Sequence, residues 1–357
     1  MVAMAATGES APAVEVWNGA LTASTYSDAS SELTSLRQAV GMYDLGDKGW
    51  IRATGSDRVR WLNGMVTNSI QQLQPGDGCY NFVLSAQGRI QGDLYAFAEQ
   101  NSLLLETGVD QISPLMALLD RFIIMDDVEL HDESAQWAGI GVAGPQAAAM
   151  LQQIGLHFDA SLQDLKPVQL LHGTLAAGEP LRLVAAYSSG VPRFELWCAP
   201  TAVLQLWNQL KAIGSAPCGA QSVEWLRILE GAPRYGADIR VKDLPQETAQ
   251  THALHFAKGC YIGQEIVERI HSRGNVHRTF TGFRLHGAAP AAGAPIEVAG
   301  QKVGEITSFA QILIDGQQHT LALGYVRREA LERKSTLQYE GGTAEAVTPP
   351  FTGIPGS

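Results

Sequence analysis

The sequence predicts an α+β protein followed by a smaller β domain at the C-terminal end. Over residues 31–279, helical and strand-like segments interleave without regular βαβ units, which favours α+β over a doubly wound sheet. From about residue 280, short apolar runs are separated by glycine, proline and Asp-Gly, as is typical of a small antiparallel barrel or sandwich. A chain of 357 residues is also too long for one modest core, so two or three domains are expected.

Within the predicted body, the spacing of apolar residues indicates whether each segment is a helix or a strand. Residues 56–73 carry apolar side chains at helical spacing behind Ser56, a typical N-cap residue, so we expect one helix there. Residues 79–97 alternate apolar and polar side chains around a turn near Gly88, which predicts a hairpin. The later segments follow the same patterns, with helices expected over 112–124 and 199–214 and strands over 127–131, 137–142, 181–187 and 193–198.

The composition is that of a globular protein and argues against two classes of partner. Hydrophobic residues make up 45% of the chain and charged residues 17%, which is enough apolar material for a sizeable core. The 25 basic against 36 acidic side chains give a formal net charge of −11, whereas nucleic-acid binding needs a positive surface. No apolar run reaches the roughly 18 residues of a membrane span. We expect neither a nucleic-acid nor a membrane partner, and we expect residues 1–30 to form a mobile arm.

The cysteines indicate a reducing compartment. The chain has four of them, widely spaced and without a Cys-x-x-Cys pair: Cys79, Cys198, Cys218 and Cys260. The N-terminal stretch lacks the basic and apolar regions of a secretory signal, so disulfides are not expected. We therefore expect a cytoplasmic protein with free thiols.

One stretch, "FAKGCYIGQEIVERIHSRG", combines a lone thiol with glycines and charges. Cys260 lies between Gly259 and Gly263, two residues from Lys258 and just before a predicted short helix. A helix N-terminus and a nearby ammonium both favour the thiolate over the thiol. The alternative is a buried, inert cysteine, the commoner fate of a free thiol, and position alone does not decide between them. Over residues 258–278 basic side chains also outnumber acidic ones, which suggests either an anionic ligand or a helix face with internal ion pairs.

Two other patterns are weaker. "GIGVAG", from Gly139 to Gly144, has the glycine spacing of a dinucleotide-binding loop, but it lacks the preceding apolar strand and the βαβ context. His252 and His255 with Cys260 do not make a tetrahedral ligand set, so no metal site is expected. Neither a Gly-x-Ser-x-Gly elbow nor a phosphate-binding Walker sequence occurs.

At "KGCYIGQE", preceded by "LPQE" and followed by "RIHSRGNVHR", the sequence resembles the YgfZ family of folate-binding proteins. These are relatives of the aminomethyltransferase (T-protein) of the glycine cleavage system. Residues 42–97 resemble the N-terminal block of that superfamily, and "LRILEGAPRYGAD" resembles its Arg-x-x-x-Gly-x-Pro-x-Tyr-Gly segment. The resemblance implies a folate-binding body of two α+β subdomains over residues 31–279 and a C-terminal antiparallel β-barrel with a tail over residues 280–357.

The resemblance also implies the site residues. Glu195, in "RFELWC", falls at the family's pterin-binding carboxylate, and a carboxylate can accept two parallel hydrogen bonds from a pterin edge. Arg227 matches an arginine that helps to bind folate, and Tyr235 belongs to the same segment. Asp93 matches the acidic residue beside the reactive folate nitrogens. Cys260, with Lys258, is the reactive group of the specific motif.

Two departures from the T-protein pattern shape the functional expectation. Gly92-Asp93 replaces a paired Asp-Asp, which weakens the case for aminomethyl transfer, and Cys260 marks the YgfZ branch. We therefore expect a tetrahydrofolate-binding factor that supports assembly or repair of iron–sulfur proteins, with client or assembly proteins as partners. The alternatives are a folate-dependent one-carbon transferase or demethylase that uses Asp93 as general acid/base, and an interaction module with a vestigial folate pocket.

Overall fold

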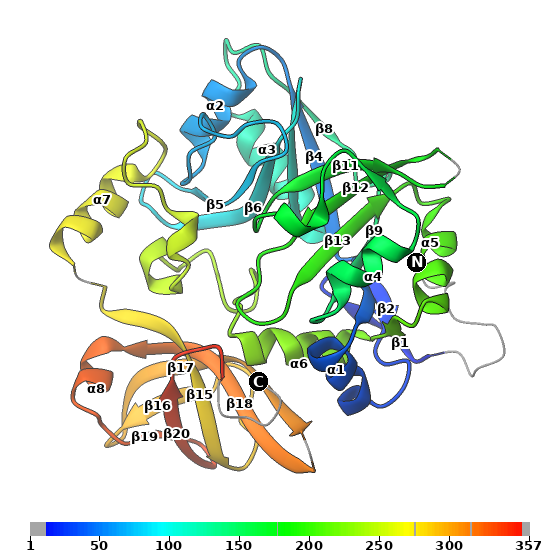
Figure 1. Ribbon diagram of the computed structural model, residues 1–357. Helices are drawn as coiled ribbons and strands as arrows, with labels where there is room; N and C mark the ends of the chain where they lie inside the picture. Colours follow the sequence, from blue (N-terminus) through cyan, green and yellow to red (C-terminus); the bar gives the residue numbers. More distant parts are fainter. Residues whose placement is uncertain (1–11, 177, 275, 315, 352–357) are drawn as a thin grey trace. The chain divides into compact units, whose positions relative to one another are not determined.

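The computed structural model describes residues 12–351 except 177, 275 and 315 (Figure 1). The chain forms two compact units. Unit 1 comprises Met1–Asn81 and Asp93–Val223, and unit 2 comprises Phe82–Gly92 and Glu224–Ser357. The predicted fold class, an α+β body with a C-terminal antiparallel β-barrel, is confirmed. Part of the arm predicted over residues 1–30 lies outside the described residues. Its described part contains a hairpin of β1 (Val14–Trp17) and β2 (Ala20–Ala23).

The larger sheet of unit 1 has seven strands. Its order is β10 (His157–Phe158), β11 (Leu170–Thr174), β12 (Pro180–Ala185), β13 (Arg193–Cys198), β9 (Ala138–Ala143), β3 (Gly41–Asp44) and β14 (Ala216–Pro217). All neighbours are antiparallel except the β3–β14 pair at one edge. One face packs against α4 (Ala147–Gln153) and α5 (Val203–Ala212), where Leu151, Leu206, Trp207 and Leu210 are buried. The other face is therefore available to the second sheet.

The second sheet has five strands in the order β5 (Gly78–Leu84), β6 (Ile90–Ala98), β7 (Leu103–Gly108), β4 (Lys48–Thr54) and β8 (Glu129–Asp132). The turn end of the β5–β6 hairpin belongs to unit 2, and the remainder of the sheet belongs to unit 1. In a strand, alternate side chains point to the same face. Lys48, Trp50 and Arg52 of β4 therefore share the face that meets the seven-stranded sheet.

The helices of the body are short. Besides α4 and α5 they are α1 (Ala29–Gln38), α2 (Arg58–Met65), α3 (Ile112–Asp120), α6 (Ala220–Glu230) and α7 (Gln264–Arg273), with 3-10 turns at Val109–Gln111, Leu162–Asp164, Pro245–Thr248 and Thr251–Ala253. Within the described part of the chain, no helix has both the length and the apolar character needed to cross a membrane.

The helix predicted over residues 56–73 is shorter than expected. Its N-cap is Asp57 rather than Ser56, and it ends at Met65. Beyond Met65, a side chain takes the place of a helical carbonyl as acceptor. The Asn63 side chain accepts a hydrogen bond from the backbone N–H of Ile70 at 3.0 Å. Such side-chain acceptors offer the backbone an alternative to continued helix, which apolar spacing does not reveal.

The C-terminal domain is a closed barrel rather than a sandwich. Its strands follow the order β15 (Arg278–Gly287), β18 (Gln317–Arg327), β17 (Gln301–Ile314), β16 (Pro295–Val298), β19 (Leu337–Tyr339) and β20 (Gly342–Val347), with β20 pairing back to β15. The short helix α8 (Arg328–Glu332) follows β18. The interior is filled by apolar side chains, including Phe283, Ile296, Ile306 and Val326.

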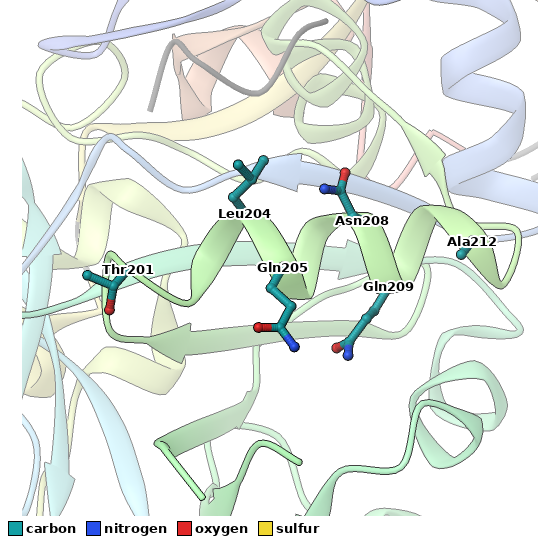
Figure 2. Close-up of a pocket in the computed structure, with 6 residues that line it drawn as sticks. All are labelled: Thr201, Leu204, Gln205, Asn208, Gln209 and Ala212. Atoms are coloured by element: carbon teal, nitrogen blue, oxygen red, sulfur yellow. The ribbon is translucent and has the colours of Figure 1, made fainter. Parts of the chain in front are cut away.

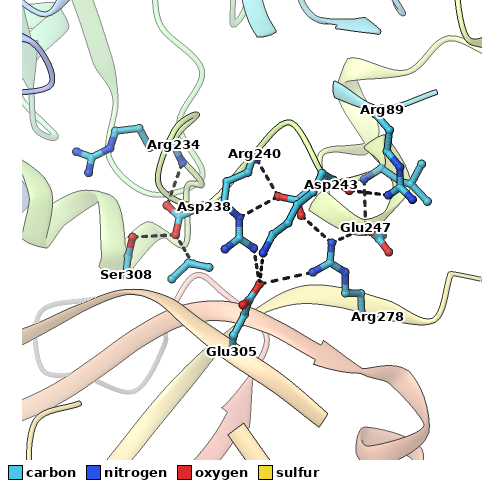
Figure 3. A network of polar contacts seen from close by, with 12 residues as sticks. Arg89, Arg234, Asp238, Arg240, Asp243, Glu247, Arg278, Glu305 and Ser308 are labelled. Atoms are coloured by element: carbon cyan, nitrogen blue, oxygen red, sulfur yellow. Dashed lines mark hydrogen bonds and ion pairs between the residues drawn. The ribbon is translucent and has the colours of Figure 1, made fainter. Parts of the chain in front are cut away.

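A network of ion pairs fastens a loop of unit 2 to the barrel (Figure 3). Arg278, the first residue of β15, lies 2.6 Å from the buried carboxylate of Asp243. Arg240 lies 2.6 Å from Glu305 of β17. Because a buried carboxylate needs a compensating charge, the arginine on β15 holds the loop around Asp243 on this side of the barrel.

Candidate functional site

A buried polar centre lies in unit 1, where the two sheets face each other. Charged and polar side chains from five strands and the turn after β7 meet there: Lys48, Tyr80, Asp93, Tyr95, Glu106, Gln111 and Glu195. Protein interiors rarely hold several ionisable groups unless these are paired or functional. This centre is therefore the candidate site.

Glu195 is the carboxylate that β13 contributes to the polar centre. Its side chain is only 7% exposed. The Trp197 indole donates a hydrogen bond of 3.0 Å to Oε2. Among the described residues, no donor reaches Oε1. This oxygen can therefore accept a hydrogen bond from a ligand or water.

Lys48 and Glu106 form an ion pair beside Glu195. Burial, followed by the neighbouring charge of Glu195, raises the pKa of Glu106 to about 7. Burial alone would lower the pKa of Lys48, but the charges of Glu106 and Glu195 raise it well above its usual value. The sequence reading missed both residues of this pair.

Asp93 is held rigidly at the other side of the polar centre. Its carboxylate accepts hydrogen bonds from the Tyr80 hydroxyl at 2.5 Å and from the Gln111 side-chain amide at 2.8 Å. Burial raises the pKa of Asp93, although these two hydrogen bonds oppose the shift. A fixed carboxyl group with a raised pKa is suited to proton transfer or to hydrogen bonding with a ligand.

Aromatic side chains flank these charges. The rings of Tyr80 and Tyr95 lie 4.9 Å apart, and the Trp197 ring contacts Phe97 at 5.6 Å and Trp50 at 5.5 Å. Aromatic surfaces beside convergent polar groups are typical of sites for flat organic ligands. A signal for this arrangement exists in the sequence, because on three strands a charged residue is followed two positions later by an aromatic one.

Arg227 and Tyr235 lie in unit 2, whereas Glu195 and Asp93 lie in unit 1. Within unit 2 the Arg227 guanidinium donates all five of its N–H groups, to Glu224, the Ala232 carbonyl, Asp238 and Ser308. The Tyr235 hydroxyl donates to the carbonyl of Gln91 at 2.8 Å. Arg227 thus has a clear structural role, and folate contacts by Arg227 and Tyr235 stay predictions.

Cys260 is exposed, in contrast to the buried Cys198 and Cys218. This exposure removes the alternative of a buried packing cysteine. Burial raises the pKa of Cys198 to about 12 and that of Cys218 still further. The Lys258 ammonium lies 5.0 Å from the centre of the Tyr261 ring.

The two glycines around Cys260 differ in what the fold requires. Gly263 has a positive φ of 82°, and a Cβ there would lie 2.6 Å from the carbonyl oxygen of Ser85, so only glycine fits. At Gly259 the backbone needs no positive φ, and a Cβ would meet no atom within 4 Å. Packing therefore explains Gly263 but not Gly259.

Two other kinds of site have little support in the described residues. Among the residues that the structure describes, no group of three or more His, Cys, Asp or Glu side chains is arranged to hold a metal ion. A surface depression runs along α5 and is drawn in Figure 2, lined by Thr201, Leu204, Gln205, Asn208, Gln209 and Ala212. These six side chains include no ionisable group, so the depression offers less chemistry than the polar centre.

Family models match most of the chain. Residues 8–258 match the model described as "GCVT N-terminal domain". Residues 278–353 match the model described as "CAF17, C-terminal beta-barrel domain". The second match covers the closed barrel of unit 2.

Similar proteins include several transferases. An aminomethyltransferase of Streptomyces avermitilis is 30% identical over 311 residues, covering 84% of this chain and 82% of its own length. A putative chloroplastic transferase of Arabidopsis thaliana is 26% identical and covers 85% of this chain and 69% of its own length. The crystal structure of the glycine cleavage system aminomethyltransferase T from Bartonella henselae superposes with a TM-score of 0.81 at 20% identity, covering 96% and 94% of the two chains. The fold shared with that aminomethyltransferase therefore includes both units.

Proposed function

Because the chain belongs to the GCVT N-terminal domain family and carries a CAF17-type C-terminal barrel, we propose that it is a tetrahydrofolate-binding factor that supports assembly or repair of iron–sulfur proteins. Folate is its ligand in this proposal, and iron–sulfur client or assembly proteins are its partners. Similar proteins are named aminomethyltransferases, whereas this proposal assigns the chain a different role that uses the exposed Cys260.

The observation that carries the folate assignment is the state of Glu195. This carboxylate is buried, is oriented by the Trp197 indole, and keeps one oxygen without a donor among the described residues. The pterin edge offers two adjacent N–H donors, and a carboxylate accepts such a pair in parallel. The partly exposed Tyr95 ring, 4.9 Å from the Tyr80 ring, would offer the pterin a flat surface beside these charges. The polar centre therefore fits the ligand that the family uses.

The support for an iron–sulfur role comes from the motif around Cys260. The thiol is exposed, so it can reach a group on another protein, and Gly259 is a glycine that local packing does not require. Cysteine thiolates are the usual ligands of iron–sulfur clusters. In this proposal Cys260 reacts or ligates transiently while folate binds in unit 1.

Calorimetric titration of the purified protein with 5-formyltetrahydrofolate tests the folate assignment. Glu195→Gln should weaken binding by about one to two decades, since a charged hydrogen-bond partner in a buried site contributes roughly 1.5–3 kcal/mol. Glu129→Gln, which changes an exposed carboxylate on β8, is the matched control and should bind like the wild type. Equal affinity of the wild type and Glu195→Gln would remove the assignment.

Complementation of a strain that lacks the protein tests the iron–sulfur role. Cys260→Ala should keep folate affinity but fail to restore the activities of iron–sulfur enzymes. Cys79→Ala, a change at another thiol that is not fully buried, is the control and should restore them. Full complementation by Cys260→Ala would exclude a role for the thiol.

A second candidate function is folate-dependent one-carbon transfer or demethylation. The observation in its favour is Asp93, whose carboxyl is held by two hydrogen bonds and whose pKa is raised by burial. If Asp93 is a general acid/base, Asp93→Asn should abolish turnover of a folate substrate and leave binding nearly intact. If the protein is an assembly factor, the same variant should leave iron–sulfur enzyme activities in cells close to normal, and this is the outcome we expect.

A further inference from the structure

We propose that Gln111 is a positioning residue for Asp93: its side-chain amide keeps Oδ1 of that carboxylate as a hydrogen-bond acceptor and confines any proton on Asp93 to Oδ2, beside the Tyr80 hydroxyl. The inference rests on the proposed folate site, to which Asp93 belongs, and it concerns how that site holds a proton. Gln111 acts through Asp93 in this account and does not itself contact the folate.

Gln111 reaches Asp93 where side-chain contacts replace the ladder between β6 and β7. The residue pairs of these two strands end at Tyr95 and Glu106. Beyond them, the Thr107 hydroxyl donates to the Asp93 carbonyl oxygen at 2.7 Å. The Gln111 Oε1 accepts from the Asp93 backbone N–H at 3.1 Å. Two side chains therefore satisfy the backbone groups of Asp93 and fix its position.

The place of Gln111 in the fold indicates that its side chain serves Asp93 rather than its own helix. Gln111 is the N-cap residue of α3, but its side chain makes no capping hydrogen bond. Serine, threonine, aspartate and asparagine are the residues that cap helices well. Gly108 leaves room for the amide, since a Cβ there would lie only 3.3 Å from Gln111 Nε2. Helix capping therefore does not explain a glutamine at this position.

The backbone N–H of Asp93 determines which end of the Gln111 amide faces the carboxylate. An N–H group can only donate, so the atom opposite it must be the amide oxygen. The amide nitrogen then faces Oδ1 of Asp93, at 2.8 Å. With the amide turned round, its NH₂ group would meet the backbone N–H and its oxygen would meet the carboxylate. Only one orientation therefore makes both hydrogen bonds.

This orientation distinguishes the two carboxylate oxygens of Asp93. Oδ1 receives an N–H from Gln111, so it stays an acceptor. Oδ2 lies 2.5 Å from the Tyr80 hydroxyl, which can either donate or accept. A proton that Asp93 takes from a ligand therefore forms its O–H bond at Oδ2. The electron pair of the broken bond stays on the ligand atom, and the Tyr80 hydroxyl changes from donor to acceptor.

The charged groups around Asp93 act in both directions. Lys48 of β4 favours the ionised carboxylate, whereas Asp110 from the turn after β7 opposes it. Tyr95 of β6 stays neutral, because burial raises its pKa further above its usual value. Burial raises the pKa of Asp93, and its two side-chain hydrogen bonds oppose that rise. Loss of the bond from Gln111 should therefore favour the protonated carboxyl.

Carbon-13 NMR of protein labelled at its aspartate carboxyl groups measures the titration of Asp93 without folate. The Asp93 signal is assigned by its absence from Asp93→Asn. Gln111→Leu should raise the titration midpoint by about one pH unit or more, because it removes a hydrogen bond to the ionised form. Gln169→Leu is the matched control, because Gln169 Nε2 donates to Asp77 at 2.9 Å elsewhere in unit 1. It should leave the Asp93 midpoint unchanged.

Two further variants separate positioning from helix stability. Gln111→Ser offers α3 a better N-cap, so it should be at least as stable as Gln111→Leu in urea denaturation. Its Asp93 midpoint should nevertheless rise by a similar amount. Gln111→Glu should titrate at a higher pH than either, because two facing carboxyl groups share a proton. A wild-type Asp93 midpoint in Gln111→Leu or in Gln111→Ser would overturn the positioning role.

Infrared spectroscopy tests the assignment of the two oxygens. The difference between the spectra of the wild type and Asp93→Asn, recorded below the titration midpoint, isolates the C=O stretching band of protonated Asp93. With the proton on Oδ2, the C=O bond is that of Oδ1, and the hydrogen bond from Gln111 lowers its frequency. The band should therefore rise more in Gln111→Leu than in Tyr80→Phe. The opposite order would place the proton on Oδ1 and overturn the assignment.

These outcomes are separate from the test of the proposed function. Both measurements use the protein without folate, so they confirm or refute the role of Gln111 even if the wild type does not bind folate. If folate binds and Glu195→Gln weakens binding, a wild-type Asp93 midpoint in Gln111→Leu overturns only the positioning role.

Discussion

Replacing Arg227 by methionine should strongly destabilise unit 2. The guanidinium lies 2.6 Å from Glu224 and 2.7 Å from Asp238, and the Asp238 side chain is fully buried. The substitution removes all five hydrogen bonds of Arg227 and leaves Asp238 without this cation. Breaking a buried ion pair from one side typically costs about 3–5 kcal/mol, and we expect a loss of that size in the free energy of unfolding.

Urea denaturation, followed by both circular dichroism and tryptophan fluorescence, measures this loss and tests whether the transition is cooperative. Arg234→Met is the matched control, because Arg234 forms a longer ion pair with Glu224, at 3.4 Å, and should lose less than about 1 kcal/mol. Arg227→Met/Asp238→Asn should recover part of the stability by removing the uncompensated charge. An Arg227→Met variant within about 1 kcal/mol of the wild type would refute the structural role deduced from these contacts.

Three further predictions concern other described residues. Glu32→Gln should lower the free energy of unfolding by about 1–3 kcal/mol in the same assay. Both Glu32 oxygens accept hydrogen bonds from N–H or O–H donors, and the NH₂ group of glutamine would face the donors of one oxygen. Unchanged stability would contradict this prediction. For Glu99, burial alone would raise the pKa, but Arg182 and Arg52 hold it at about 2. The ionised Glu99 carboxylate therefore contributes its full stabilisation above pH 4.5, and this stabilisation is lost as the pH falls towards 2. In acid denaturation, Glu99→Gln should lose less stability over that pH interval than the wild type. Mass spectrometry after alkylation of the native protein should find Cys260 modified faster than the buried thiols, whereas equal rates would indicate that the loop is closed in solution.

Much of the fold could be predicted because its signals are local. Alternating apolar residues predicted the strands of the body, and short apolar runs between glycines and prolines predicted a C-terminal β domain that is a closed barrel. The prediction failed after Met65, where the Asn63 side chain takes the amide of Ile70. Apolar spacing cannot register such a polar contact, so the predicted helix was too long.

The candidate site was predictable only in part. Resemblance to a known family pointed to Glu195 and Asp93, and both belong to the polar centre of unit 1. Lys48 and Glu106 are 58 positions apart and meet only because β4 pairs with β7 in a particular register. Neither residue belongs to a recognisable motif, so the pair was missed.

The sequence by itself determined the order of helices and strands, the need for glycine at positions such as Gly263, and the "KGCYIGQE" segment around Cys260. These features depend on side-chain periodicity, backbone conformation and residue identity, all of which act over a few neighbouring positions. Only the tertiary structure decided which charges are buried and what each one contacts. It directs all five Arg227 donors into unit 2, pairs Lys48 with Glu106, and leaves an oxygen of Glu195 without a donor among the described residues. The physical reason is that desolvation and charge pairing depend on distances between residues remote in sequence, and folding alone sets those distances.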